Sequence, residues 1–125
     1  MGTFRVGCKI QHIADSKRTA KVERLLVDTG SDYTWLPGNV LEKLGVARVK
    51  KDVVFTMANG KSITRALGYV IIDCDQFRTV DEVVFAEPGD MLLLGARTLS
   101  GFNAAVDSKK ERLATAGPIL AAAAS

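Results

Sequence analysis

Short runs in which apolar and polar residues alternate recur along this chain and constrain its fold more than any other feature. In residues 4–11 every second side chain is apolar, which is the two-residue period of a half-buried β-strand. A second alternation over residues 20–24 passes into the fully apolar run Leu25-Leu26-Val27. Further strand-like runs occupy residues 53–57, 62–75, 77–87, 91–95, 103–107 and 111–115. The sequence therefore predicts an all-β fold.

Two segments break this pattern and predict short helices. In residues 39–45 the apolar side chains fall on one helical face, with Asn39 as the expected N-cap and Gly45 as the terminating residue. Residues 96–101 can hold a short helical turn. One or two small helices are thus expected among the strands.

Asn59-Gly60 stands between two strand-like runs and is the strongest hairpin signal in the chain. This dipeptide favours a type I′ turn, which needs positive φ at both central residues. The sequence predicts a β-hairpin whose tip lies at residues 58–61. Such a hairpin could fold over a site and exclude water from it.

Composition narrows the class of protein. With 125 residues, 47% of them hydrophobic, the chain is expected to form a single domain over residues 1–125. Its 17 basic and 14 acidic residues are scattered, so no nucleic-acid surface is expected. No apolar stretch approaches the roughly 20 residues of a membrane span, and the start of the chain does not resemble a signal region. We expect no membrane association and a cytoplasmic location.

The potential metal ligands are few and poorly spaced. Cys8 and Cys74 lie far apart in strand-like runs, and His12 is the single histidine. This spacing does not suggest a zinc site, so no metal and no cofactor are expected. Both thiols are interpreted as small buried hydrophobes.

A carboxylate follows the apolar run that ends at Val27. In the stretch RLLVDTGSDYTWLP, Asp28 is succeeded by Thr29, Gly30 and Ser31, each of which can offer a hydrogen-bond donor. A second aliphatic run, MLLLGAR, also ends on glycine, at Gly95, but carries no carboxylate. Asp28 is therefore the candidate catalytic group.

With these features the chain resembles the retropepsin-like aspartic proteases, the small homodimeric relatives of pepsin, and its length is closer to the bacterial members. The similarity spans nearly the whole chain and rests on four features: Asp28-Thr29-Gly30-Ser31, the hairpin TMANGK, Leu93-Leu94-Gly95 and the segment VDSKKERL. The resemblance implies an acid protease barrel with one active-site loop per chain. It also implies peptide or protein substrates.

The chemistry of that family requires two carboxyl groups. One takes a proton from the attacking water while the other protonates the scissile carbonyl, and the close pair shares one proton. Because this chain has one Asp-Thr-Gly, the resemblance implies an aspartic endopeptidase whose dyad is formed by Asp28 of two copies in a homodimer.

The resemblance also implies roles for neighbouring residues. The Thr29 hydroxyl would reach the partner's loop, the Gly30 N–H would bind the Asp28 carboxylate, and the Ser31 hydroxyl would bind its outer oxygen. A flap of residues 57–60 would bind the substrate strand. The flap residues are Met57, Ala58, Asn59 and Gly60, and suggested pocket walls are Met57, Leu26 and Val84.

Other interpretations remain open at this point. Asp28-Thr29-Gly30 could be an ordinary turn after a strand, and the fold could serve as a catalytically silent peptide-binding or dimerisation module. Tyr33, Trp35 and Leu36 are interpreted as core beneath the loop rather than as substrate contacts. Asp32 and Arg97 would either pair and brace the loop or remain solvated.

Overall fold

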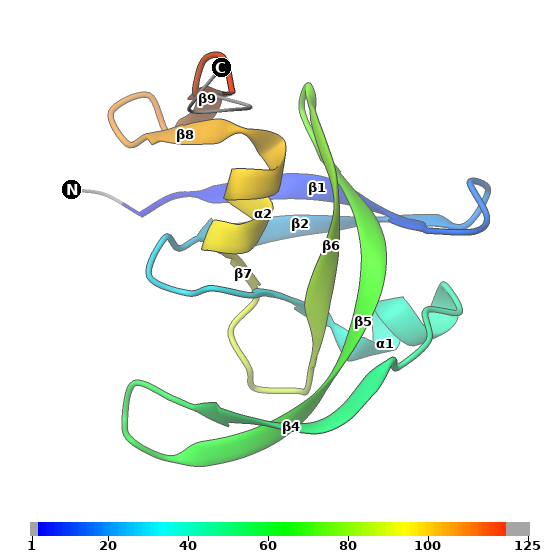
Figure 1. Ribbon diagram of the computed structural model, residues 1–125. Helices are drawn as coiled ribbons and strands as arrows, with labels where there is room; N and C mark the ends of the chain where they lie inside the picture. Colours follow the sequence, from blue (N-terminus) through cyan, green and yellow to red (C-terminus); the bar gives the residue numbers. More distant parts are fainter. Residues whose placement is uncertain (1–2, 120–125) are drawn as a thin grey trace, which may run out of the picture.

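The computed structural model describes residues 3–119, which fold into nine strands and two short helices (Figure 1). In chain order these are β1 (Arg5–His12), β2 (Thr19–Val27), β3 (Thr34–Pro37), α1 (Gly38–Lys43), β4 (Lys50–Thr56), β5 (Ser62–Cys74), β6 (Phe77–Ala86), β7 (Leu93–Leu94), α2 (Ala96–Phe102), β8 (Ala104–Asp107) and β9 (Arg112–Thr115). The predicted all-β class with small helices is confirmed.

Six of the strands form a closed ring. Seven strands pair in the order β1-β2-β7-β3-β6-β5-β4, and β1 also pairs with β5, which closes the ring and leaves β4 outside it. Closure removes the open edges that a flat sheet would expose. The inward side chains form a core that includes Ile10, Leu25, Leu36, Ile72 and Leu94, all nearly inaccessible to solvent. A barrel-like arrangement was the expected one.

Strand β5 belongs to two structures at once. Its second half pairs with β1 and β6 inside the ring, whereas its first half pairs with β4 in a hairpin that projects away from the ring (Figure 1). The hairpin lies where Asn59-Gly60 predicted one.

The prediction of a type I′ turn at the tip of this hairpin is wrong. The N–H of Gly60 donates to the Met57 carbonyl at 2.9 Å, and the N–H of Met57 donates to the Lys61 carbonyl at 2.8 Å. Of the turn residues only Gly60 has positive φ, at 84°. This is the pattern of a three-residue loop that ends in a left-handed glycine, and the Asn59 side chain accepts a hydrogen bond from the N–H of Lys61 at 2.9 Å.

The first helix begins earlier than expected. Pro37 is the N-cap and the helix starts at Gly38, so Asn39 lies inside the first turn and the expected Asn39 cap is wrong. Pro37 is also the last residue of β3, and because it has no N–H it cannot donate a hydrogen bond to the ladder. Gly45 follows the helix with φ of 79°, the left-handed conformation that ends many helices.

The end of the described chain forms a separate hairpin. Strands β8 and β9 pair antiparallel as a two-stranded sheet, at the position expected from residues 103–115. Within residues 3–119, no helix is long and apolar enough to cross a membrane, and no cluster of three or more His, Cys, Asp or Glu side chains could hold a metal ion.

Candidate active site

Asp28 lies at the common end of two parallel strands. Strand β2 pairs with β7, with Val27 opposite Leu94, so the two aliphatic runs that end on glycine are neighbours in space. The N–H of Asp28 donates to the Leu94 carbonyl at 3.0 Å. This bond fixes the backbone of Asp28 at the point where β2 leaves the ring.

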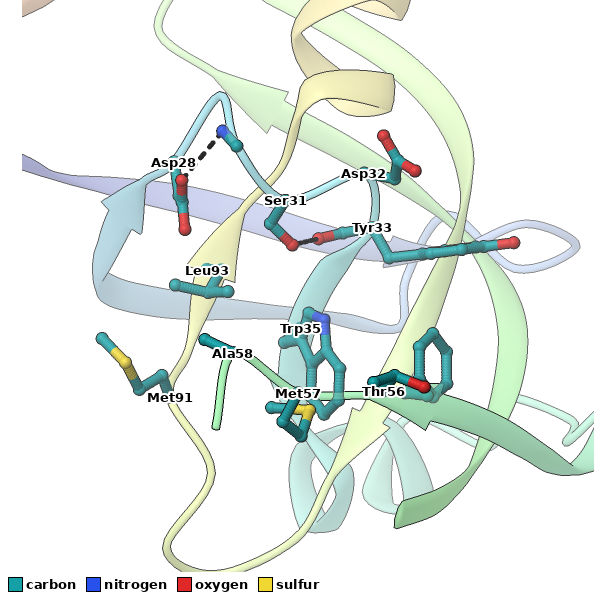
Figure 2. A pocket seen from close by; sticks show the side chains of 12 residues that line it. Asp28, Ser31, Asp32, Tyr33, Trp35, Thr56, Met57, Ala58, Met91 and Leu93 are labelled. Carbon is teal, nitrogen blue, oxygen red and sulfur yellow. Dashed lines mark hydrogen bonds between the residues drawn. The ribbon is translucent and has the colours of Figure 1, made fainter. Parts of the chain in front are cut away.

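The Asp28 side chain is half-buried and turns back on its own loop. Its Oδ1 accepts a hydrogen bond from the N–H of Gly30 at 2.9 Å (Figure 2), the contact that the family resemblance implied. A bond from a backbone N–H to a carboxylate restricts its orientation. Thr29 and Gly30 lie exposed beside it at the surface of this chain.

Ser31 does not contact the Asp28 carboxylate. Its hydroxyl donates to the carbonyl of Tyr33 at 3.1 Å (Figure 2), so the expected bond to the outer oxygen of Asp28 is wrong in this chain. The local reason is the turn itself, since the N–H of Ser31 donates to the Asp28 carbonyl at 3.3 Å. Ser31 therefore stabilises the loop backbone, and the outer carboxylate oxygen faces the cavity.

The start of α2 supports residues 28–33, which connect β2 to β3 and are called here the Asp28 loop. The N–H of Ala96 donates to the Ser31 carbonyl at 2.7 Å, and the N–H of Arg97 donates to the Asp32 carbonyl at 3.0 Å. Gly95 approaches the loop so closely that a Cβ built on it would lie 2.6 Å from the Tyr33 carbonyl carbon. Glycine is required here because the approach leaves no room for a side chain.

A buried chain of hydroxyl groups fixes Gly95. Its N–H donates to Thr34 Oγ1 at 2.9 Å, Thr34 and Thr98 hydroxyls lie 2.6 Å apart, and Thr98 donates to Asp81 Oδ2 at 2.7 Å. Both threonines are fully buried. Since Thr34 accepts from Gly95 and Thr98 donates to Asp81, the proton between the two hydroxyls belongs to Thr34. The network joins β3, α2 and β6 under the Asp28 loop.

A cavity of about 440 Å³ opens between the Asp28 loop and the β4–β5 hairpin. Figure 2 shows its side chains, which come from the loop, from β3, from the hairpin, and from β7 and the segment before it. The lining residues are Asp28, Gly30, Ser31, Asp32, Tyr33, Trp35, Phe55, Thr56, Met57, Ala58, Met91 and Leu93. A carboxylate at one side of an apolar cavity is a typical arrangement for a binding site.

The apolar wall of the cavity is largely aromatic. The rings of Tyr33 and Phe55 meet edge to face with centroids 5.6 Å apart, and Trp35 and Phe55 lie 5.2 Å apart. Leu36 and Trp35 are buried in the core, as expected, and Tyr33 packs against the same cluster as Trp35. Tyr33 and Trp35 also line the cavity. Trp35 is buried and fulfils both roles.

The predicted wall and flap residues are only partly brought together. Met57 and Ala58 line the cavity with Asp28, whereas Asn59 and Gly60 lie exposed beyond it at the hairpin tip. Leu26 and Val84 do not line it, and Val84 is fully buried beneath it. The sequence interpretation missed Phe55 and Met91, which carry no local signal because tertiary contacts alone place them here.

Arg97 braces Tyr33 rather than the Asp32 side chain. Its guanidinium lies 4.7 Å from the centre of the Tyr33 ring, and its Nη1 lies 3.5 Å from Glu82 Oε1. Lys50 Nζ lies 2.9 Å from the other oxygen of Glu82. Glu82 thus links the base of the hairpin to a wall of the cavity, and the expected alternative of an Asp32–Arg97 side-chain pair is not formed.

The Glu82 side chain is 4% exposed and is paired with the cations of Lys50 and Arg97. Burial raises the pKa of Glu82, but ion pairing with Lys50 and Arg97 outweighs burial, so the pKa lies below its usual value. The ionised carboxylate therefore stabilises the folded state at pH values above the pKa of a glutamate in the unfolded chain, about 4.3. This contribution is lost as the pH falls through the lower pKa of the folded chain.

We expect Glu82→Gln to lower the free energy of unfolding at pH 7 and to lower it less as the pH approaches 3. Urea unfolding at a series of pH values measures the difference between the variant and the wild type. Glu23→Gln, which changes an exposed carboxylate on β2, is the matched control and should show little pH-dependent loss. A Glu82→Gln effect that is constant with pH would contradict this role.

A second ion pair holds the hairpin to the loop before β7. Arg65 of β5 contacts Asp90 at two points, Nε to Oδ2 at 2.7 Å and Nη2 to Oδ1 at 2.8 Å, and both side chains are 12% exposed. The Arg65 guanidinium lowers the pKa of Asp90. Such two-point pairs restrict geometry, so the segment that carries Met91 is fixed against the hairpin.

The sequence was compared with known protein families and with curated proteins. A family described as aspartyl protease matches residues 14–98, more than half of the chain. The matched segment contains Asp28, the β4–β5 hairpin and Gly95. No curated protein sequence matches the chain.

Proposed function

The chain belongs to the aspartyl protease family, in its retropepsin type, and we propose that it is an endopeptidase whose catalytic dyad consists of Asp28 from each of two copies. The observation that carries the proposal is the Asp28 carboxylate itself. It is held by the Gly30 N–H and borders a largely apolar cavity of about 440 Å³.

A second copy is needed because this chain offers no partner carboxylate for Asp28 among its described residues. Asp32 also lines the cavity, but its side chain points away from Asp28 (Figure 2). Acid–base hydrolysis needs two carboxyl groups in different protonation states. A twofold axis beside the exposed Thr29-Gly30 edge would bring two Asp28 side chains together.

In the proposed reaction the ionised Asp28 of one copy accepts a proton from water as the water oxygen attacks the scissile carbonyl carbon. The protonated Asp28 of the other copy donates its proton to the carbonyl oxygen, which gives a gem-diol. The first Asp28 then gives the proton it took from water to the amide nitrogen, while the other Asp28 takes a proton from a gem-diol hydroxyl. The C–N bond breaks to give a carboxylic acid and an amine, and the dyad returns to its starting protonation state. The Gly30 N–H keeps each carboxylate oriented throughout.

The β4–β5 hairpin is proposed to cover the bound peptide. Its tip is exposed, and its inner residues Met57 and Ala58 face the cavity that Asp28 borders. An extended peptide can hydrogen-bond to backbone groups of such a hairpin and place alternate side chains in pockets. Covering the peptide would also exclude bulk water from the reacting carbonyl.

Digestion of a diverse peptide library by the purified protein tests this function. We expect cleavage that is favoured at acid pH, whose rate per chain rises with protein concentration because single chains lack a dyad. The cleavage sites would also define which side chains the aromatic wall accepts. A folded, dimeric protein that cleaves no peptide at any pH would instead support the silent peptide-binding module.

A further inference from the structure

The two cysteines, distant in the sequence, meet where the ring of strands closes. Strands β1 and β5 pair antiparallel from His12 opposite Val70 to Lys9 opposite Asp73. The Lys9 and Asp73 side chains are 3.7 Å apart, Nζ to Oδ2. The next position of the same register places Cys8 opposite Cys74.

Contacts of the sulfur atoms agree with this register. Cys74 Sγ lies 3.5 Å from the carbonyl oxygen of Gly7, the residue bonded to Cys8. Both cysteines are free, and both side chains belong to the same buried core, with 4% and 1% of Cys8 and Cys74 exposed. Opposed residues on antiparallel strands have Cα separations that match those of disulfides.

The two thiols also interact with each other. Hydrogen bonding to Cys74, together with burial, raises the pKa of Cys8 above its usual range. The same hydrogen bond lowers the pKa of Cys74, against the opposing effect of burial. The two thiols therefore titrate as one coupled pair, and the thiolate of either cysteine is the reactive form.

A surface groove reaches one member of the pair, Cys8. A groove of about 430 Å³ is lined by Gly7, Cys8 and Lys9 of β1, Lys21, Val22 and Glu23 of β2, and Asp73 and Asp75 near the end of β5. The β1–β2 ladder is interrupted between Val6 and Cys8, so the backbone is irregular beside the thiol. A molecule as small as a hydroperoxide fits this entrance.

We propose that Cys8 and Cys74 form a reversible cross-strand disulfide when the protein meets a hydroperoxide. The thiolate of one cysteine attacks one peroxide oxygen and breaks the O–O bond, which gives a sulfenic acid on that cysteine and, for hydrogen peroxide, hydroxide. The sulfur of the other cysteine then attacks the sulfenic sulfur and expels the sulfenic oxygen as water. Two thiols are oxidised by two electrons, and the peroxide is reduced to water.

The bond would fix the β1–β5 pairing that closes the ring. It would join positions roughly 65 residues apart, and cross-links across long loops restrict the unfolded chain strongly. We expect the oxidised protein to melt on the order of 10 °C higher than the reduced protein. Dithiothreitol should reverse the shift.

The experiment treats the folded protein with hydrogen peroxide, alkylates it under denaturing conditions and maps tryptic peptides without reduction. We expect peptide 6–9 linked to peptide 66–78 with a loss of about 2 Da relative to the free thiols. Oxidised Met57 and Met91 appear in other peptides and do not interfere. Two alkylated cysteines, or a sulfinic acid on either one without a link, would overturn the proposal.

Cys8→Ala is the matched variant. It leaves Cys74 without a partner, so peroxide should no longer raise the melting temperature or produce a linked peptide. An equal rise in this variant would show that the stabilisation has another source. If the variant does not fold, the peptide map of the wild type decides by itself. None of these results depends on peptide cleavage, so the inference stands or falls independently of the proposed function.

Discussion

Asp28→Asn is expected to reduce kcat/KM for any peptide that the protein cleaves by about 10³-fold or more, because it removes the group that accepts and returns a proton. The substitution is conservative for the fold. Asparagine keeps an oxygen that can accept the hydrogen bond now made by the Gly30 N–H at 2.9 Å. The melting temperature should therefore change little.

The measurement compares initial rates for wild type and variant on one peptide at its optimal pH, together with thermal unfolding of both. Asp75→Asn is the matched control, since Asp75 is exposed in the turn between β5 and β6 and has a positive φ that asparagine also tolerates. It should retain full activity. If Asp28→Asn kept more than about a tenth of the wild-type rate, the assignment of Asp28 would be wrong.

Gly95→Ala is the second substitution with a large expected effect, this time on stability. The added Cβ would lie 2.6 Å from the carbonyl carbon of Tyr33 and 2.9 Å from the carbonyl oxygen of Asp32. Both are backbone atoms of the Asp28 loop, which hydrogen bonds from Ala96 and Arg97 hold in place. Either the loop or the start of α2 must move. We expect a loss of about 3 kcal/mol in the free energy of unfolding.

Gly7→Ala provides the comparison. A Cβ on Gly7 would approach no atom closer than 3.9 Å, so the free energy of unfolding should change by less than about 0.5 kcal/mol. Urea unfolding of both variants against the wild type measures the difference. Similar stabilities for the two alanine variants would contradict the close packing of Gly95 against the loop.

Strand positions were predictable from the sequence because most strands bury one face and so repeat every two residues. Strand β3 escaped prediction. It has only four residues, Thr34–Pro37, three of them buried, so no alternation exists to be recognised. Its position between β7 and β6 depends on pairing with both, and such pairing is a property of the folded chain.

The centre of the candidate site was predictable and its surroundings were not. Asp28 follows a buried strand, and that local feature is visible in the sequence. The buried charge of Glu82 is different, because Lys50 and Arg97, the cations that stabilise it, come from β4 and α2. Met91 likewise faces Asp28 across the cavity only because Arg65 and Asp90 hold its segment. No local pattern encodes these contacts.

Family knowledge also transferred unevenly to individual residues. The Gly30 N–H donates to Asp28 Oδ1 as the resemblance implied, and an aspartate favours this bond to the N–H two residues later in any turn. Ser31 instead donates to the Tyr33 carbonyl. A hydroxyl rotates to whichever acceptor its surroundings provide. The acceptor for Ser31 therefore depends on the folded conformation of the Asp28 loop and cannot be read from the residue type.

Subunit mixing is the most direct test of the central claim that two Asp28 side chains form one site. Wild-type protein, at a concentration where its specific activity no longer rises, is allowed to exchange subunits with increasing amounts of Asp28→Asn protein. If mixed dimers are inactive, activity per wild-type chain should fall to about one half at equal amounts and to about one tenth at ninefold excess. Activity that is unchanged by the excess variant would mean that each chain acts alone and would contradict the dimeric dyad.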